Sequence, residues 1–479
     1  MKSYKITTLG CKVNQYDASS AEKLLAADGF SPADATSSAS IVLVNTCCIT
    51  AVAMRKSRQA IRKLVRANPD AVICVLGCYS TYHADKISQV LTELGISEDR
   101  QIIAGHHENV RKAIEIAIKR VAQATQSNPA VAESTASSED KSPKTIKQRR
   151  LKAVNHETVA TQTMPTIDKF GGHQRAFIKI QDGCDAFCSY CVVPYTRSKV
   201  WSKSPQTVLE ECKALIAGGH REIVLCGVFL GAYLQPTTIR RNWEDQAPAH
   251  LANLVREICK LEGLWRVRLS SLEPGDVTPA LLEAARDCEK FAPHLHLPLQ
   301  SGSVEILRKM NRQYQASEFV ATSKKLREIW DRPALSTDII VGFPGETQAC
   351  FEETLEIARA CEFSKIHAFP FSAIEPTPAW QNRHEMPSPQ IVRARMDQLA
   401  EIERENFARY RESFVGQTMP AIVETSKAAP GFARAMTDRY ISVDFEVSSP
   451  EHKASLAGQI VQLEITKLSQ AGLLGKLAD

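Results

Sequence analysis

Short continuous apolar runs alternate with amphipathic segments over the first quarter of the chain. Apolar strands without strict alternation are typical of a parallel sheet that helices cover on both faces. The strands are expected at residues 4–9, 41–44, 71–76 and 101–104, and the helices at 18–27, 51–67, 84–94 and 108–121. The pattern therefore predicts an α/β domain over residues 1–121.

The periodicity stops after this domain. Ser, Thr, Ala, Pro and charged residues dominate residues 122–169, which are predicted to form a flexible linker. A basic run at residues 144–152 lies inside it. The composition favours a solvated charge cluster there over a nucleic-acid contact.

A second alternation of apolar strands and helices covers residues 170–402. The strands are expected at residues 176–181, 222–226, 267–270, 294–299, 336–341 and 366–371, with helices at 205–217, 251–261, 279–288 and 316–330 among those between them. Six β/α units without a dinucleotide-binding glycine pattern predict a partial parallel (β/α)6 barrel. The active residues of such barrels lie on the loops that follow the strands.

The last part of the chain changes to short alternating strands. A charged helix at residues 389–412 leads out of the barrel, so that residues 403–414 connect it to a β module at 415–470. The strands of this module are expected at residues 417–424, 431–435, 441–445 and 459–466. Small β-barrels often bind single-stranded nucleic acid. The basic and aromatic side chains favour that role over a structural cap: Lys427, Arg434, Arg439, Phe432 and Tyr440.

Composition limits the class of protein. The 479 residues are 44% hydrophobic and 24% charged, which is typical of a globular protein with several domains. No apolar run is long enough to span a membrane, and the first ten residues do not resemble a signal peptide, so a cytoplasmic location is expected. The net charge of +5 permits a polyanionic partner without requiring one.

The 14 cysteines, in a chain without an export signal, indicate metal or catalytic use. Cys184, Cys188 and Cys191 lie on one short loop after the first predicted barrel strand. Cysteine thiolates hold iron–sulfur clusters, and three ligands on a four-iron cluster leave one iron uncovered. Such an iron can bind a substrate or a cofactor.

Two other interpretations of this loop compete. Zinc favours paired Cys-x-x-Cys or Cys/His ligands that close a tetrahedron, and no fourth Cys or His follows nearby. A disulfide framework is typical of small secreted domains rather than of a long chain. The spacing therefore favours an iron–sulfur cluster with an uncovered iron.

Three further cysteines each follow a strand of the N-terminal domain. Cys11, Cys47 and Cys78 come directly after the first, second and third predicted strands. The carboxyl ends of parallel strands share one edge of the sheet, so these cysteines are expected to converge as a second three-cysteine set. The alternative is that they are small buried hydrophobes, which suits Cys74 and Cys48 better.

The loops after the other barrel strands carry candidate cofactor contacts. Glycines allow close approach of the backbone to a ligand, and polar side chains hold ribose or amino-acid groups. The candidates are Gly227, Gly231, Ser270, Glu273, His296, Gln300, Gly342 and Gly345. A buried structural histidine remains an equal alternative for His296. The turn at residues 342–347 lacks the Gly-Lys-Ser/Thr of a nucleotide P-loop.

Together these motifs resemble the methylthiotransferases of the radical S-adenosylmethionine superfamily. The Cys-x-x-x-Cys-x-x-Cys loop with Tyr190 before its last cysteine is similar to the superfamily signature. The three strand-end cysteines resemble the methylthiotransferase N-terminal domain, and the C-terminal β module resembles a TRAM domain. The resemblance covers nearly the whole chain apart from the linker.

The resemblance implies a mechanism. Cys184, Cys188 and Cys191 would bind a 4Fe–4S cluster that cleaves S-adenosylmethionine, giving a radical that takes hydrogen from carbon 2 of a modified adenine. Cys11, Cys47 and Cys78 would bind a second 4Fe–4S cluster that carries the sulfur. The TRAM-like module and the basic helix around residues 54–66 would grip the anticodon arm of tRNA, although a solvated basic face is an equal alternative for that helix.

Three branches of the family act on different substrates. Residues 8–17, Thr-Leu-Gly-Cys-Lys-Val-Asn-Gln-Tyr-Asp, resemble the branch that modifies N6-threonylcarbamoyladenosine in tRNA. The alternatives within the family are isopentenyladenosine in tRNA and an aspartate of a ribosomal protein. A non-catalytic, metal-containing RNA-binding protein is the alternative from another class. Ser198, where the family usually has glycine, Cys48 and the long linker depart from the family pattern.

Overall fold

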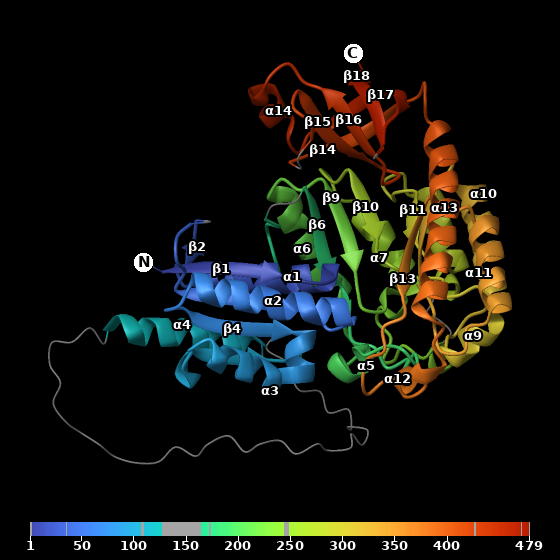
Figure 1. The fold of residues 1–479 in the computed structure, drawn as a ribbon. Helices are drawn as coiled ribbons and strands as arrows, with labels where there is room; N and C mark the ends of the chain where they lie inside the picture. The colour runs from blue at the N-terminus through green and yellow to red at the C-terminus, as the bar shows by residue number, and fades with distance from the viewer. Residues whose placement is uncertain are drawn as a thin grey trace, which may run out of the picture.

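The computed structural model contains three structured parts (Figure 1). It describes residues 2–34, 36–106, 110–126, 164–171, 174–243, 249–425, 428–470 and 472–478. Most of the predicted linker, with its basic run, and Lys427 of the predicted nucleic-acid contact lie outside these residues.

The N-terminal part is the predicted parallel sheet, with strand order β2-β1-β3-β4-β5. Its strands are β1 (Ser3–Thr8), β2 (Ser31–Pro32), β3 (Ile41–Thr46), β4 (Val72–Gly77) and β5 (Gln101–Ala104). Its helices are α1 (Lys12–Ala27), α2 (Ala51–Ala67), α3 (Cys78–Glu93) and α4 (Val110–Gln126). Helices α2 and α3 pack on one face and α1 and α4 on the other, which explains why β3 and β4 are buried along their whole length.

The central part is the predicted partial barrel of six parallel strands. Its strands are β6 (Arg175–Lys179), β9 (Glu222–Cys226), β10 (Arg266–Leu269), β11 (His294–His296), β12 (Ala334–Val341) and β13 (Lys365–Pro370). They form two three-stranded sheets, β10-β9-β6 and β11-β12-β13, which isolated bridges between β10 and the region of β11 connect.

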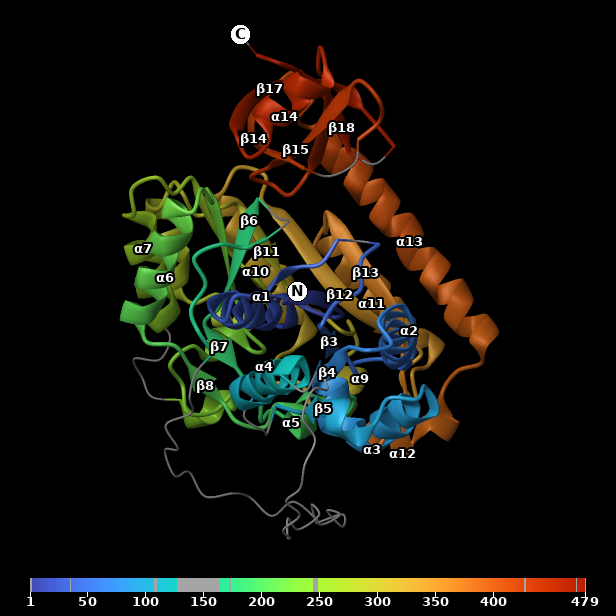
Figure 2. The same cartoon turned by 90° about the vertical axis from the view of Figure 1, so that its left-hand side faces the viewer.

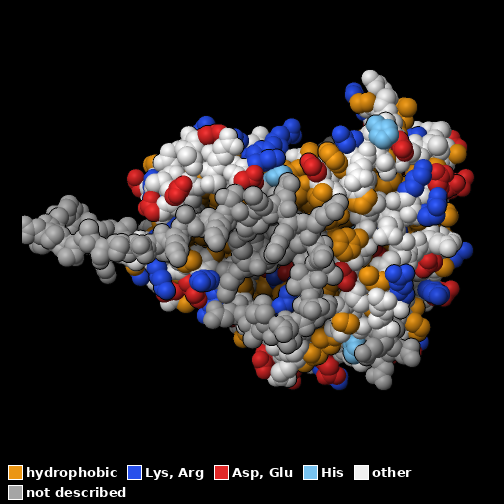
Figure 3. Space-filling model, turned by 90° about the horizontal axis from the view of Figure 1, so that it is seen from below, with side chains coloured by type: hydrophobic (Ala, Val, Ile, Leu, Met, Phe, Trp, Pro, Cys, Tyr) orange, Lys and Arg blue, Asp and Glu red, His pale blue; other side chains and the backbone are white. Residues whose placement is uncertain are grey.

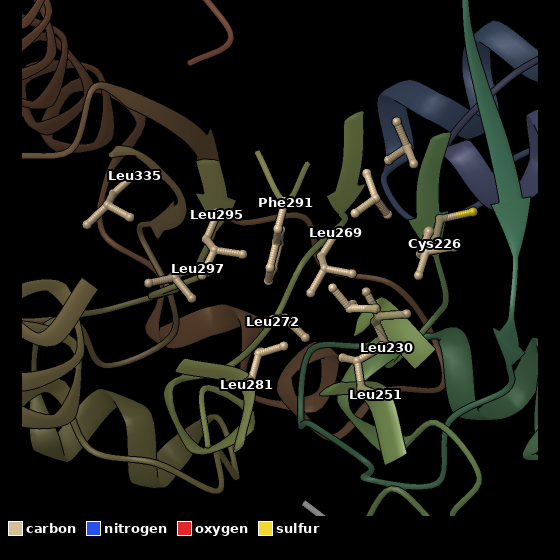
Figure 4. Packing of buried hydrophobic residues seen from close by; sticks show 14 of the residues in the cluster. Cys226, Leu230, Leu251, Leu269, Leu272, Leu281, Phe291, Leu295, Leu297 and Leu335 are labelled. Carbon is tan, nitrogen blue, oxygen red and sulfur yellow. The ribbon is translucent and has the colours of Figure 1, made fainter. Parts of the chain in front are cut away.

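Helices cover the outside of the barrel. They are α6 (Pro205–Ala217), α7 (His250–Cys259), α8 (Pro279–Asp287), α9 (Val304–Lys309), α10 (Ala316–Ile329) and α11 (Gln348–Ala360). Leucines from the strands and the helices meet around Phe291, as Figure 4 shows for Leu269, Leu281 and Leu295. Burial of this continuous apolar cluster holds the ends of the strands in place. The loops of the candidate site follow directly after these strand ends.

Helix α1 of the N-terminal part packs directly on β6 of the barrel (Figure 2). Val13 and Tyr16 of α1 belong to the hydrophobic core of the barrel. The two α/β parts therefore share an interface, and α1 belongs to both.

The C-terminal part is a closed five-stranded barrel with order β14-β15-β16-β18-β17. Its elements are β14 (Thr418–Glu424), β15 (Phe432–Thr437), β16 (Ser442–Glu446), α14 (Pro450–Leu456), β17 (Ile460–Leu468) and β18 (Leu473–Leu477), of which α14 and β18 were not predicted. Helix α13 (Pro389–Glu412) leads to it.

The small barrel lies against the end of the large barrel at which its strands begin. Arg266 and Arg268 of β10 donate to the main-chain oxygens of Met436 and Thr437, at 3.2 and 2.8 Å. The loops after the barrel strands lie at the other end, with α5 (Val193–Thr196) and α12 (Pro378–Gln381) at the bottom of Figure 1. No helix among the described residues is long and apolar enough to cross a membrane.

Candidate active site

The three N-terminal cysteines lie at neighbouring strand ends. Cys11 is the N-cap of α1 after β1, Cys47 follows β3, and Cys78 is the first residue of α3 after β4. Since β1, β3 and β4 are adjacent in the sheet, the predicted convergence has a direct structural basis. Burial, with smaller contributions from Cys78 and Cys11, raises the pKa of Cys47 to about 12, so the three thiols lie within electrostatic reach.

Asn14 fixes the loop that carries Cys11. Its side-chain amide donates to the main-chain oxygens of Leu9, at 2.8 Å, and Thr46, at 3.0 Å. The amide of Asn45 donates in turn to the main-chain oxygen of Asn14 at 2.7 Å. These buried bonds tie the segments before Cys11 and Cys47 to each other.

Cys184, Cys188 and Cys191 occupy the loop after β6 and the short strand β7 (Gln181–Asp182). The Cys191 amide donates to the Cys188 carbonyl at 2.9 Å, which makes a turn of the loop's second half. Burial raises the pKa of Cys184 to about 11 although Thr238 Oγ1 lies 3.4 Å from its sulfur. Burial, Cys188 and Cys184 raise the pKa of Cys191, which places these three thiols within electrostatic reach as well.

A buried arginine contacts this cysteine loop. Arg312 Nη1 lies 3.1 Å from Cys188 Sγ, and its Nη2 is paired with Glu273. Arg240 Nη1 also pairs with Glu273, at 2.6 Å, and its Nη2 pairs with Asp276 at 2.8 Å. The Glu273 carboxylate therefore holds the arginine that faces Cys188, and its direct contact with a cofactor stays a prediction.

The two cysteine sets lie close together although the sequence separates them widely. Val192, one residue after Cys191, is 1% exposed and packs in the same hydrophobic cluster as Cys48 and Cys78. Cys48 is hydrogen-bonded to Cys78, which raises the pKa of Cys48, and Cys191 contributes to the same shift. The interface between the two α/β parts thus runs between the two cysteine sets.

An ionic network crosses this interface. Arg197 Nη1 forms two hydrogen bonds of 2.7 Å with the Asp182 carboxylate, and its Nη2 donates to Asn14 Oδ1 at 2.8 Å and to Asp17 Oδ2 at 3.0 Å. Lys179 pairs with both Asp17 and Asp182. The network joins the loop of the second cysteine set to the helix that begins at the first.

The polar candidates on the other loops make internal contacts. His296 is bonded on both sides, with Ser336 Oγ 3.0 Å from Nδ1 and Asp338 Oδ2 3.2 Å from Nε2. The backbone of Gln300 bridges to β12, and Ser270 is buried at the end of β10. Their roles as cofactor contacts stay predictions.

The candidate glycines all have close neighbours. A Cβ atom at Gly231 would lie 2.2 Å from Asp276 Oδ1, and one at Gly342, where φ is +81°, would lie 2.6 Å from Val392. Gly227 and Gly345 meet Gln181 and Lys309 in the same way. Close neighbours account for glycine at Gly231, whereas Gly345 meets only the flexible end of Lys309 and is favoured as glycine by its φ of +76°. The approach of these glycines to a cofactor stays a prediction.

The sequence interpretation missed several residues around the cysteines. His106 Nε2 lies 3.6 Å from Cys78 Sγ, and Arg197, Arg312 and Asn14 were assigned no role. A cavity of about 1340 Å³ borders the network and is lined by His106, Arg197 and Ser198, among other residues. Asn14 and Arg197 lie within recognisable segments near the cysteines, but their contact was not predictable from spacing.

The two cysteine sets can be compared with the metal centre that each of them would hold. Among the described residues, no three His, Cys, Asp or Glu side chains are grouped closely enough for one metal ion. The three thiols of the Cys184 loop fit a cluster of several irons in which one iron lacks a protein ligand, whereas the N-terminal set has Cys48 as a fourth thiol beside Cys78.

Two family models match the chain. Residues 3–96 match the family described as "Uncharacterized protein family UPF0004", and residues 178–358 match the radical SAM superfamily. The first match contains Cys11, Cys47 and Cys78, and the second contains Cys184 and the rest of its loop.

Curated relatives match over almost their full length. The chain is 31% identical to a threonylcarbamoyladenosine tRNA methylthiotransferase of Chlamydia pneumoniae, over 99% of this chain and 98% of the relative. It is 29% identical to the same enzyme of Bacillus subtilis, over 98% and 94%. A tRNA-2-methylthio-N(6)-dimethylallyladenosine synthase of Clostridium novyi is 30% identical, over 99% and 96%.

A solved structure shares the arrangement of the fold. The radical S-adenosylmethionine methyltransferase TsrM of Kitasatospora setae is similar with a TM-score of 0.51 and 15% identity. The match covers 89% of this chain and 79% of that protein. At this identity the likeness supports the fold alone.

Proposed function

The chain belongs to the radical S-adenosylmethionine methylthiotransferase family, and from this premise we propose that it modifies tRNA by inserting a methylthio group at carbon 2 of N6-threonylcarbamoyladenosine beside the anticodon. One observation carries the proposal: the loop of Cys184, Cys188 and Cys191 packs against the N-terminal part, where Val192 joins the hydrophobic cluster of Cys78. Radical generation and sulfur insertion need two such centres close to each other.

S-adenosylmethionine and an iron–sulfur cluster are the cofactors of this family. Cys184, Cys188 and Cys191 would hold the cluster, which when bound supplies the electron for reductive cleavage of S-adenosylmethionine. Arg312 donates to Cys188 Sγ and so places a positive charge beside the thiolates. Val192 and the packed interface exclude water on the side of the loop that faces the N-terminal part.

A second 4Fe–4S cluster on Cys11, Cys47 and Cys78 belongs to the proposal. Asn14 holds two of these strand ends in register. The hydrogen bond with Cys48 lowers the pKa of Cys78 and Arg197 adds to this effect, while at Cys11 burial raises the pKa and Arg197 opposes that rise. A cation favours the thiolate forms that iron requires.

We infer that helix α2 contacts the anticodon arm. Its sequence contains six Lys and Arg residues and no Asp or Glu. Arg55, Lys56, Lys63 and Arg66 are exposed, and the described residues provide no carboxylate partner for them. Such an uncompensated face suits phosphate groups.

The basic residues of the small barrel support RNA binding less directly. Arg434 pairs with Asp444 at 2.7 Å, and Arg439 is held by Asp438 and by the main-chain oxygen of Asp331. Tyr440 stays 42% exposed, so the aromatic part of the predicted contact is accessible. The proposal therefore assigns phosphate binding chiefly to α2.

Isopentenyladenosine in tRNA is the second candidate substrate, because synthases of the dimethylallyl product match with almost the same identity. Nucleoside analysis of tRNA separates the two. A strain without this gene should lack 2-methylthio-N6-threonylcarbamoyladenosine and regain it with the wild-type gene but not with a Cys184→Ala variant. Unchanged levels in the deletion strain would contradict the proposal.

The number of clusters needs its own measurement. Anaerobic reconstitution should give about eight irons per chain, and about four in a triple variant of Cys11, Cys47 and Cys78. Zinc in place of iron, without cleavage of S-adenosylmethionine, would favour a non-catalytic binding protein instead.

A further inference from the structure

Strands β12 and β13 present two different faces. On one face, Leu335, Ile339 and Ile366 belong to the same hydrophobic core as side chains of the covering helices α11 and α13. Successive side chains of a strand point to opposite faces of a sheet. Asp338 and Phe369 therefore point away from these helices, toward the inside of the barrel.

Two aromatic rings lie next to each other on this inner face of β13. The rings of His367 and Phe369 have centres 6.4 Å apart, and the angle between their planes is 23°. Phe369 is 46% exposed, and His367 is exposed as well. The register places Phe369 opposite Ile340, near the carboxyl ends of both strands. Accessible aromatic surface thus lies toward the end of the barrel at which the cysteine loop follows β6.

Polar groups border the two rings. His367 lies opposite Asp338 in the sheet, and its ring centre is 5.9 Å from that of His296. Asp338 Oδ2 is 3.2 Å from Nε2 of His296, and the Asp338 side chain remains 32% exposed, so it can accept a further hydrogen bond. Apolar ring faces beside hydrogen-bonding groups suit a flat heteroaromatic ligand such as a purine base.

The place of β13 in the fold favours a base of the RNA over the adenine of S-adenosylmethionine. Strand β13 lies at the opposite edge of the partial barrel from β6, after which the Cys184 loop follows (Figure 2). The loop directly after β13 contacts α2, because the Ala51 amide donates to Ser372 Oγ at 3.0 Å. RNA held on α2 would therefore bring its bases to β13.

We propose that His367 and Phe369 form the surface on which the target adenine stacks once it has left the base stack of the RNA. The inference rests on the proposed function. An enzyme that acts on a base inside a folded RNA must take that base out of its stack, and stacking on aromatic side chains compensates for the lost contacts. Stacking also fixes the plane of the purine, which orients carbon 2 relative to the cysteine loop.

The test measures binding of two anticodon-arm RNAs to the full-length, reconstituted protein by fluorescence anisotropy. One RNA carries threonylcarbamoyladenosine beside the anticodon, and the other has an abasic site at that position. Phe369→Leu, which stays apolar but lacks the ring, should weaken binding of the first RNA roughly 5- to 100-fold, the range for loss of a base–aromatic stack. Binding of the abasic RNA should not change. Phe369→Trp and His367→Phe, which keep a ring, should retain the binding.

Ile391→Ala is the matched control, because Ile391 is an apolar side chain of similar exposure, 45%, on α13. It should bind both RNAs as the wild type does. Iron content and cleavage of S-adenosylmethionine without RNA should be unchanged in Phe369→Leu, which shows that the variant folds and keeps its cofactor site.

The outcomes are distinct. If Phe369→Leu weakens binding of both RNAs equally, the ring supports the general RNA surface and the inference is wrong. If it raises the concentration of S-adenosylmethionine needed for cleavage and leaves RNA binding unchanged, the rings hold the adenine of the cofactor; the inference is then wrong, while the proposed function stands. If the wild type modifies RNA with isopentenyladenosine but not with threonylcarbamoyladenosine, the proposed function fails. A loss of base-dependent binding in Phe369→Leu, measured with the isopentenyladenosine RNA, would then still support the stacking surface.

Discussion

The side-chain oxygen of Asn14 accepts a buried hydrogen bond of 2.8 Å from Nη2 of Arg197. The two residues belong to different α/β parts and are 183 positions apart. Asn14 also holds the strand ends before Cys11 and Cys47, and Arg197 follows the loop of Cys191 by six residues. This one hydrogen bond therefore connects the two chain segments that position the two cysteine sets.

Replacing Arg197 should weaken the interface between the two α/β parts. Arg197→Gln leaves Asp17 and Asp182 buried with only Lys179 to balance them, which should cost about 3–5 kcal/mol of unfolding free energy. Urea denaturation measures this loss, and iron analysis should show poor loading of both cysteine sets. Arg221→Gln, which removes an exposed contact with the Gly263 oxygen, should change neither quantity appreciably. Equal effects of the two variants would contradict the role of the network.

The same network predicts how stability depends on pH. Burial opposes ionisation of Asp182, but Arg197 and Lys179 outweigh it and hold the pKa of this carboxyl well below its usual value. A depressed carboxyl pKa contributes stability that is complete above about pH 4, the unfolded value, and is lost as the pH falls toward the folded value. The urea midpoint of the wild type should therefore fall more steeply below pH 4 than that of Asp182→Asn. Parallel curves would show that Asp182 is not ionised in the folded protein.

Two glycines allow the strand end at Cys78 to be tested. Gly77 has φ of +96°, and a Cβ atom there would lie 2.4 Å from the main-chain oxygen of Thr46. Gly95 has φ of +81° but nothing within 4 Å. Both changes to alanine add backbone strain of about 1 kcal/mol, and only Gly77→Ala adds the clash with β3.

Thermal unfolding should show a clearly larger loss for Gly77→Ala than for Gly95→Ala. Iron bound by the N-terminal cysteines should fall only in Gly77→Ala, since the clash moves the start of α3. A variant of Gly77 that loads iron normally would show that the strand end tolerates the shift.

The sequence predicted the layers of the fold because they depend on local hydrophobic patterns. Continuous apolar runs located β3, β4 and β9 to within two residues. The starts of α1 and α3 were placed too late, by about six residues each, because their N-caps are Cys11 and Gly77, neither of which supplies a side-chain cap. Strand β18 was missed since Gly475 interrupts a short run of leucines.

The cysteine positions were predictable for the same reason, since each one follows an apolar strand. The supporting contacts were not. Arg312 reaches Cys188 from 124 positions away, and Arg197 reaches Asn14 across two domains. Such pairs depend on how separately folded parts pack, which periodicity along one segment does not contain.

The contact between Arg312 and Cys188 should set the redox properties of the radical-generating cluster. Arg312→Gln removes a buried positive charge 3.1 Å from a ligand sulfur, which makes addition of an electron less favourable. The reduction potential, measured by titration with electron paramagnetic resonance, should become more negative, and Arg312→Lys should shift it less. Arg256→Gln on helix α7, whose guanidinium contacts the Ala280 oxygen and Glu283, is the control. An unchanged potential would limit Arg312 to a packing role.

Helix α2 should account for much of the salt dependence of RNA binding. Arg55→Gln combined with Lys63→Gln removes two exposed cations that have no carboxylate partner in the described structure. The slope of log affinity against log salt should decrease by about 0.7 to 0.9 for each lost phosphate contact. The matched pair is Lys324→Gln with Lys325→Gln on α10, which lies on the opposite side of the molecule from α2 (Figure 1).

Both double variants change the net charge equally, so a general electrostatic effect would move both slopes. A local contact would move only the slope of the α2 variant. In the view from below, Lys and Arg side chains gather along one edge of the molecule, and hydrophobic side chains lie between patches of mixed charge elsewhere (Figure 3). Since α2 begins where Ala51 donates to Ser372 Oγ, at the loop after β13, RNA held on α2 would run toward the barrel. Equal slopes for the α2 variant and the wild type would place the phosphate contacts on another surface.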